Sequence, residues 1–227
     1  MRDGAGNIDV LALWDEGAGR HPLDRALALI AAVEGTPPAH AAGLSIDARD
    51  RALYRIAARL FGHRISVIAT CAECAAETEL SFSARDALAV PEPAERISLG
   101  GGAGWCRLPC SRDLAAALTA ADPEAALFAA VIEAERPDPA LRAEAERALA
   151  AQAGLADLSL AHRCTRCGAE GQTAFDILDY LWRRIVGEAR RQLREVHVLA
   201  RAYGWTSETI LALPPARRAA HLAMIEA

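Results

Sequence analysis

The sequence predicts an α+β protein that is mostly α-helical, with a small antiparallel zinc ribbon interrupted by a long helical insertion. Three observations lead to this prediction. Several segments carry apolar residues at helical spacing. Two stretches, 65–83 and 157–175, alternate apolar and polar residues on either side of a Cys-x-x-Cys turn. The segment between them, 84–156, is rich in alanine and interrupted by proline, which is typical of short helices.

The first 64 residues predict a helical N-terminal region. Residues 8–14 form a short apolar run, which Gly17 and Gly19 end. Pro22 stands at the favourable first position of a helix over 23–33, which a Gly-Thr-Pro-Pro segment ends. Ser45 is a suitable N-cap for a second helix that reaches about Phe61 and stops at a glycine.

Two cysteine turns, here called the knuckles, are the centre of the predicted ribbon. The first is Cys71-Ala-Glu-Cys74 and the second is Cys164-Thr-Arg-Cys167. Each short turn can aim two thiolates at one point, and a structural zinc ion takes four such ligands in a tetrahedron. The two knuckles are therefore predicted to be the halves of one structural zinc site, although the segment between them is much longer than a ribbon usually has.

Other interpretations of these cysteines are weaker. Thioredoxin-like redox motifs begin a helix, whereas strand-like sequence flanks both knuckles. A catalytic zinc needs an open coordination position, and four cysteines close the site. A further alternative is that the cysteines of one or both knuckles bind no metal and are simply small buried residues. His162 is an alternative ligand because it lies close to Cys164, but it is better interpreted as an exposed strand residue.

The insertion is predicted to be mainly helical. Pro91 and Pro93 mark a linker, and the glycines of 100–104 form a flexible turn, since they lack the pattern of a phosphate-binding loop. A short strand over 105–109 leads to a helix capped by Ser111. A further helix from Asp122 to about Glu135 and one ending near Gly154 complete the segment. Two cysteines in it, Cys106 and Cys110, have no metal-ligating partner nearby in sequence and are interpreted as free thiols.

The longest predicted helix follows the second hairpin. Asp176 is its N-cap and Gly204 ends it. Thr206 or Ser207 then caps a short helix, and two prolines precede a last helix. The apolar stripe of the long helix has the spacing of a packed seam and comprises Leu178, Trp182, Ile185, Ala189, Gln192, Val196, Leu199 and Tyr203.

Arginines of the long helix lie mostly off this stripe, and a solvated face is their expected role. An acidic partner or nucleic acid is the alternative. The end of the chain also imitates a helix-turn-helix DNA reader, but the segment 208–213 carries no arginine to reach a base. The regions expected from the sequence are thus N-terminal helices (1–64), a split zinc ribbon (65–83 with 157–175), a helical insertion (84–156) and a C-terminal helical segment (176–227).

Composition excludes several functional classes. The 227 residues carry a net charge of −5, which disfavours a general nucleic-acid binder. All 25 basic residues counted as Lys or Arg are arginine, so a Walker A lysine, a Schiff-base lysine and a Ser/Lys dyad are excluded. Three histidines, His63, His197 and His221, have no nucleophile arranged around them. No enzymatic activity is expected. The N-terminus has no secretory signal and no stretch is apolar enough to span a bilayer, so a cytoplasmic protein is expected.

Several short segments resemble one protein family. The chain is similar to the baseplate hub assembly chaperones of T-even-type contractile phage tails, above all to the versions associated with bacterial contractile injection systems. The resemblance does not itself require the knuckles. It is carried by segments 9–14, 21–27, 59–62, 107–109, 111–114, 181–182, 194–197, 202–205 and 210–214, the last three being the most specific.

The resemblance implies a non-enzymatic factor that positions hub or baseplate subunits during assembly of a contractile tail, and that stays either in the cytoplasm or with the particle. A zinc-ribbon regulator that binds nucleic acid through its C-terminal helices is the alternative. In the first interpretation the zinc site, with Cys71, Cys74, Cys164 and Cys167 as ligands, is a clasp. It would bring Ile65 and Phe175 together, so that the N-terminal helices and the long helix share one core.

Overall fold

The N-terminal region is a set of helices that begin at well-formed caps. The computed structural model describes residues 8–135 and 138–226. Asp9 caps the first helix and Ser45 accepts from the Ala48 amide at the start of the fourth, as its sequence predicts. The short apolar run at the start is part of a helix rather than of a strand. The helices are α1 (Val10–Gly17), α2 (Pro22–Glu34), α3 (Pro38–Ala41) and α4 (Ile46–Phe61).

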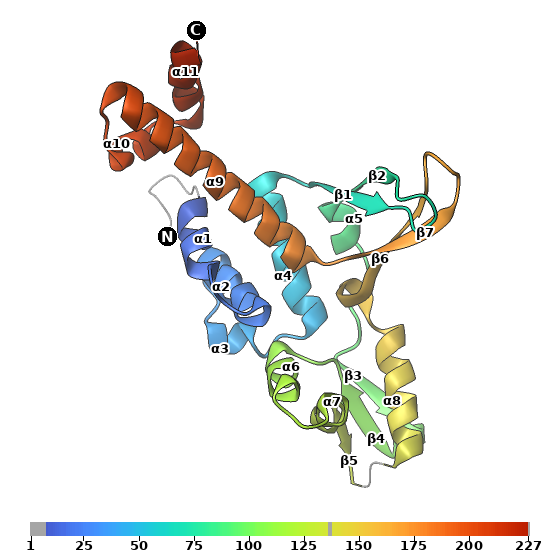
Figure 1. Cartoon of the computed structure of the whole chain (residues 1–227). Helices are drawn as coiled ribbons and strands as arrows, with labels where there is room; N and C mark the ends of the chain where they lie inside the picture. The colour runs from blue at the N-terminus through green and yellow to red at the C-terminus, as the bar shows by residue number, and fades with distance from the viewer. Residues whose placement is uncertain (1–7, 136–137, 227) are drawn as a thin grey trace.

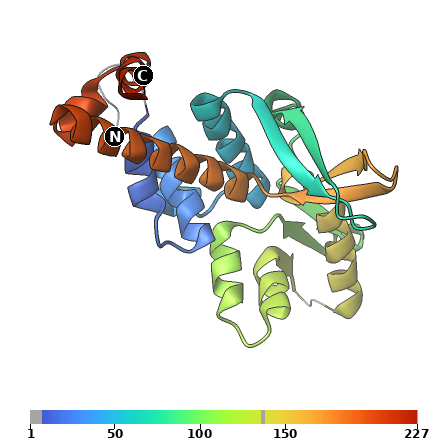
Figure 2. The same ribbon diagram turned by 45° about the horizontal axis from the view of Figure 1, so that its top comes forward.

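Two β-hairpins follow α4 and precede the long helix. The strands β1 (Arg64–Thr70) and β2 (Glu77–Ser83) pair antiparallel, and so do β6 (Leu158–Arg163) and β7 (Glu170–Phe175). The hairpins lie side by side with their turns pointing the same way (Figures 1 and 2). They form two separate two-stranded sheets. Two antiparallel hairpins that each carry a Cys-x-x-Cys turn are thus present, as expected. Among the described strands, none of one hairpin pairs with a strand of the other, and the hairpins pack through side chains.

The insertion combines short helices with a small sheet. Its three strands are ordered β3-β4-β5, all antiparallel, and a 3-10 turn over Gly100–Gly102 joins the first two. The amide of Gly100 donates to Glu144 at 3.0 Å, so this glycine turn is anchored to the neighbouring helix. The elements are α5 (Ala84–Leu88), β3 (Arg96–Leu99), β4 (Gly104–Arg107), α6 (Ser111–Leu118), α7 (Pro123–Val131), β5 (Ile132–Ala134), α8 (Pro139–Ala151) and the 3-10 helix η2 (Gly154–Asp157).

Two details of the insertion differ from the sequence prediction. Cys110, not Ser111, occupies the N-cap of α6, and its amide donates to the Asp113 carboxylate at 2.8 Å. The helix expected to reach Glu135 ends at Val131, where two consecutive β-branched residues favour extended backbone. Ile132 then pairs with Cys106 of β4, so that a sheet contact replaces the last helical turn.

The long helix α9 (Ile177–Tyr203) runs from the hairpins across the N-terminal helices and beyond them (Figures 1 and 2). Asp176 caps it and Gly204 ends it, as predicted. The ring of Trp182 lies on Gly17 of α1, where an added Cβ would come within 2.4 Å of it. Only glycine allows this close approach. The protruding end of α9 packs against α10 (Ser207–Ala212), capped by Thr206, and α11 (Pro215–Glu226).

One hydrophobic core joins the N-terminal helices, both hairpins and the first half of α9. Ile65 of β1 and Phe175 of β7 are both buried in it, as the clasp interpretation predicts. Phe175 packs edge-on against Phe82 with ring centroids 5.1 Å apart, which connects the two hairpins above their turns. The insertion has a smaller core of its own around Leu99, Cys106 and Leu141. Tyr203, the last residue of the predicted apolar stripe, is exposed.

Candidate metal centre

The two knuckles bring four thiols together. The Sγ atoms of Cys71, Cys74, Cys164 and Cys167 all lie within 4.8 Å of one another, although the knuckles are far apart in sequence. The Cys71 and Cys167 sulfurs are 3.6 Å apart, and so are those of Cys74 and Cys164. A tetrahedron of thiolates about 2.3 Å from a zinc ion has sulfurs about 3.8 Å apart. The four thiols therefore fit one tetrahedral metal ion.

Both knuckles have the same backbone turn. The amides of Cys71 and Cys164 donate to the carbonyls of Ala76 and Ala169, at 2.9 and 2.8 Å. The residue after the second cysteine of each knuckle donates back to the first cysteine and has a left-handed backbone, with φ 54° at Ala75 and φ 75° at Gly168. The two hairpins therefore share one strand–turn–strand geometry, as the similar alternation of 65–83 and 157–175 indicates.

Backbone amides prepare two of the sulfurs for ionisation. The amide of Ala76 lowers the pKa of Cys74. The amides of Cys167 and Arg166 lower the pKa of Cys164 to about 6, and the Arg166 amide lies 3.4 Å from that sulfur. These amides favour the thiolate forms of Cys74 and Cys164.

Cys167 behaves in the opposite way. The amide of Ala169 lowers its pKa, but hydrogen bonds with the sulfurs of Cys74, Cys164 and Cys71 outweigh that effect and raise it to about 12. Thiols this close share protons, because ionising each one places another negative charge beside the others. A divalent cation would remove the repulsion and let all four ionise.

Burial differs across the cluster. Cys71 and Cys164 are buried, Cys74 is half-buried and Cys167 is exposed. The guanidinium of Arg166 in the second knuckle donates to the Cys74 carbonyl of the first, which ties the two turns directly. His162 lies outside the cluster. Its ring packs over Gly171 on the neighbouring strand and is half-buried, which differs from the exposed position expected.

The two remaining cysteines lie apart from the cluster. Cys106 is buried in the small core of the insertion, where burial raises its pKa, and Cys110 begins α6. Neither forms a disulfide in the described chain. Within 8–135 and 138–226, the four knuckle cysteines are the one group of candidate metal ligands.

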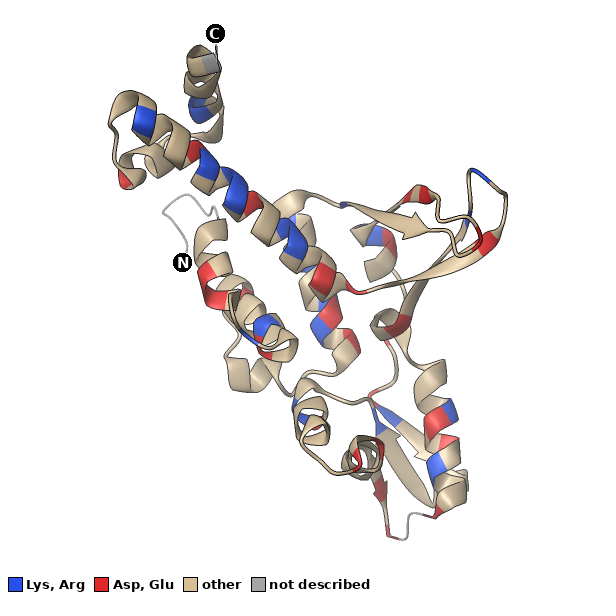
Figure 3. Ribbon diagram, in the orientation of Figure 1, with Lys and Arg blue, Asp and Glu red and all other residues tan. Residues whose placement is uncertain are grey.

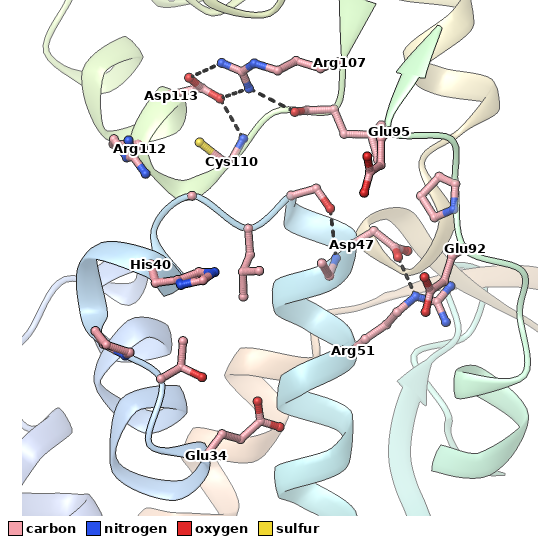
Figure 4. A pocket seen from close by; sticks show the side chains of 18 of the residues that line it. Glu34, His40, Asp47, Arg51, Glu92, Glu95, Arg107, Cys110, Arg112 and Asp113 are labelled. Carbon is pink, nitrogen blue, oxygen red and sulfur yellow. Dashed lines mark hydrogen bonds and ion pairs between the residues drawn. The ribbon is translucent and has the colours of Figure 1, made fainter.

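A cavity of about 1000 Å³ between the N-terminal helices and the insertion was not predicted from the sequence (Figure 4). Several of its charged side chains form ion pairs with each other. Arg107 holds both carboxylate oxygens of Asp113, at 2.6 and 2.9 Å, and Arg55 contacts Glu34 at 3.1 Å. Cys110 and His40 both line the cavity, but no hydrogen bond joins them in the described parts of the chain.

A buried ion pair at the edge of this cavity attaches the insertion to α4. Arg51 contacts Asp47 at 2.6 Å and donates to the carbonyls of Val90 and Pro91, where the chain enters the insertion. Asp47 also accepts from the amide of Leu155, where the chain leaves it, at 2.9 Å. The i, i+4 spacing of the two residues was the available signal, but it does not by itself distinguish a buried clamp from a surface pair.

Comparison of the chain with known protein families, with curated proteins and with solved structures finds no match. Its candidate site therefore rests on its own geometry. None of the helices in the described residues is long and apolar enough to cross a membrane.

Proposed function

We propose that the protein is a non-enzymatic assembly chaperone or adaptor for the baseplate or hub of a contractile phage-tail-like particle, stabilised by structural zinc. The short segments that resemble the tail-assembly chaperones support the tail assignment. The closed four-sulfur cluster supports a structural metal. The observation that carries the adaptor role is the C-terminal arm, defined as residues 193–225, which leaves the shared core.

Zinc at the knuckles would act on folding rather than on chemistry. Four thiolates fill a tetrahedral coordination sphere and leave no position for water or substrate. Binding of zinc to such a site contributes on the order of 10 kcal/mol in isolated knuckle peptides at neutral pH. In this chain the gain would hold the two hairpins together at their turns. Because their strands belong to separate sheets, no backbone pairing does so.

The C-terminal arm has the surface expected of a partner-binding element. Ile210 and Leu199 are buried in the arm. Tyr203 and Trp205 stack on each other, and His221 packs edge-on against both rings. Large apolar side chains nevertheless stay exposed on it, with Met224 at 61%. Clusters of exposed apolar residues mark protein interaction sites. The exposed set on the arm is Leu193, Tyr203, Leu211, Met224 and Ile225.

Co-purification tests this proposal. The zinc-loaded protein would be co-expressed with hub and baseplate subunits of a contractile phage-tail-like particle, one at a time. We expect at least one subunit to be retained, and the double variant Leu211→Ser, Met224→Ser to lose it. The variant Ile68→Ser is the matched control, because Ile68 is 55% exposed but lies on β1, away from the arm. Retention of no subunit, or equal retention by both variants, would count against the adaptor role.

A zinc-containing regulator that binds nucleic acid is the second candidate. The arginines of α9 favour it, since they form a band along the protruding helix (Figure 3). The net charge of −5 and the absence of arginine in α10 disfavour it. Binding to duplex DNA that weakens steeply with added salt would support this candidate over the first.

A further inference from the structure

An exposed glycine interrupts the middle of α9. Gly187 is solvent-exposed and has helical backbone. A Cβ built on it would meet no atom within 4 Å. Glycine costs a helix interior about 0.5–1 kcal/mol relative to alanine. Neither packing nor backbone conformation in the described chain requires glycine here, which distinguishes Gly187 from Gly17 under the ring of Trp182.

Four arginines surround this glycine. Side chains three and four positions away are its neighbours on a helix surface, and at Gly187 these are Arg183, Arg184, Arg190 and Arg191. Gly187 therefore leaves a gap in the side-chain surface of α9, here called the notch, with an arginine at each of these four neighbouring positions. Gly187 lies about 200° around the helix from the buried Ile185, so the notch faces away from the core.

The arginines around the notch are only partly neutralised. Arg183 pairs with Asp179, and Arg191 pairs with Glu188 and Glu195. Arg184 lies over the ring of Phe61, with 4.7 Å to its centroid, and makes no ion pair in the described chain.

Arg190 has no ion pair or side-chain hydrogen bond with the residues that the structure describes. The same is true of Arg194 and Arg201, which continue the same face of α9. The notch and the face beyond it thus carry net positive charge.

We propose that this notch is a docking site for an acidic α-helix of a partner protein, whose backbone approaches α9 at Gly187 while its carboxylates meet the flanking arginines. This site would specify the chemistry of the partner that the adaptor binds, and it depends on the proposed function only because a protein partner is required. A residue without a side chain lets two helices approach closely, and guanidinium groups bind carboxylates in a two-pronged geometry.

Two other occupants fit the notch less well. A second copy of the chain that used the same face would place arginine opposite arginine, which is repulsive. A nucleic acid is recognised by long side chains that reach phosphates and needs no gap in the helix surface, and the chain is acidic overall. The combination of a gap and flanking positive charge therefore favours an acidic helix.

The test uses defined probes rather than an unidentified partner. The first probe is an alanine-based helical peptide of about 20 residues with glutamate along one face, so that small residues separate the carboxylates. The second is the same peptide with glutamine in place of glutamate, and the third is a short DNA duplex. Binding to the full zinc-loaded chain is measured by fluorescence anisotropy at low and at physiological salt. We expect the glutamate peptide to bind most tightly, and its affinity to fall with salt.

Two kinds of variant distinguish the effect of the gap at Gly187 on peptide binding from the effect of positive charge. Gly187→Leu keeps every arginine and raises helix propensity, so it should leave thermal stability equal or higher while weakening peptide binding about tenfold. Ala216→Leu on α11 is its control. Arg190→Gln should weaken binding, and Arg217→Gln on α11 should not.

Several results would overturn the proposal. If Gly187→Leu binds the glutamate peptide as tightly as the wild type does, the notch is not the binding site. If the two peptides bind equally well, the ligand need not be acidic. If DNA binds more tightly than the glutamate peptide, the site favours nucleic acid over a protein partner. If no probe binds, the proposed site does not exist. Because no tail subunit is used, these outcomes are independent of the co-purification result.

Discussion

The repeated turn of the two knuckles leads to a pair of opposite stability predictions. Ala75 and Gly168 hold equivalent positions, four residues after Cys71 and Cys164, and both have left-handed backbone, with φ 54° and 75°. Their amides donate to the carbonyl of the first cysteine at 2.9 and 3.0 Å. One knuckle has the residue that this conformation favours and the other does not.

The magnitude follows from the backbone. A left-handed conformation costs a residue with a Cβ about 1–2 kcal/mol. Glycine loses about 0.5–1 kcal/mol more than alanine when it is ordered, so Ala75→Gly should stabilise the protein by about 0.5–1 kcal/mol. For a chain of this size that raises Tm by about 1–4 °C. Gly168→Ala should lower stability by a similar amount, because an added Cβ there meets no atom within 4 Å and no clash adds to the strain.

The assay is thermal unfolding of the zinc-loaded protein, followed by circular dichroism at fixed protein and zinc concentrations. Ala76→Gly is the matched control, since it makes the same change one residue later, where φ is not positive. That variant should be slightly less stable than the wild type. A lower Tm for Ala75→Gly, or an unchanged Tm for Gly168→Ala, would refute the reasoning.

Three further predictions follow from other residues. Cys74→Ser should release zinc and lower both Tm and soluble yield, whereas Cys110→Ser should keep one zinc per chain in metal analysis; zinc retained by the first variant would contradict the site. Asp47→Ala should cost about 3–5 kcal/mol in urea unfolding because it leaves the buried Arg51 without its partner, while Glu16→Ala, which breaks an exposed pair with Arg20, should cost less than about 1 kcal/mol. Burial raises the pKa of Asp50 to about 6, despite the opposing effect of Arg49, so the folded state binds the proton more tightly than the unfolded state. The contribution of Asp50 to stability should therefore fall as pH rises from about 4 to 6. The difference in free energy of unfolding between the wild type and Asp50→Asn should show this trend, because effects common to both proteins, such as zinc loss, cancel. Parallel pH profiles of the two proteins would contradict it.

Residues with a local physical role were the ones that the sequence predicted well. Ser45, Asp176 and Gly204 mark helix ends through their own side chain or backbone freedom, and each stands where it was expected. The meeting of the knuckles was also predictable, because four cysteines in two short turns have a common ligand chemistry. Neither inference needed long-range information.

Features that depend on contacts across the chain were missed. The strand β5 follows directly from a helix, and its pairing with β4 places Ile132 in a sheet that the local sequence did not indicate. The sequence did not indicate how the two hairpins pack on each other, and in the structure Phe82 and Phe175 join them by side-chain contact. The clamp of Asp47 and Arg51 has the spacing of a common surface pair. It becomes a buried attachment only because both ends of the insertion return to it.

The most direct test of the clasp is X-ray absorption at the zinc edge on the protein purified without added metal. The account predicts one zinc ion per chain with four sulfur neighbours at about 2.3 Å and no oxygen or nitrogen ligand. A substoichiometric metal content, or a first shell that includes oxygen or nitrogen, would contradict a closed four-cysteine site formed by Cys71, Cys74, Cys164 and Cys167.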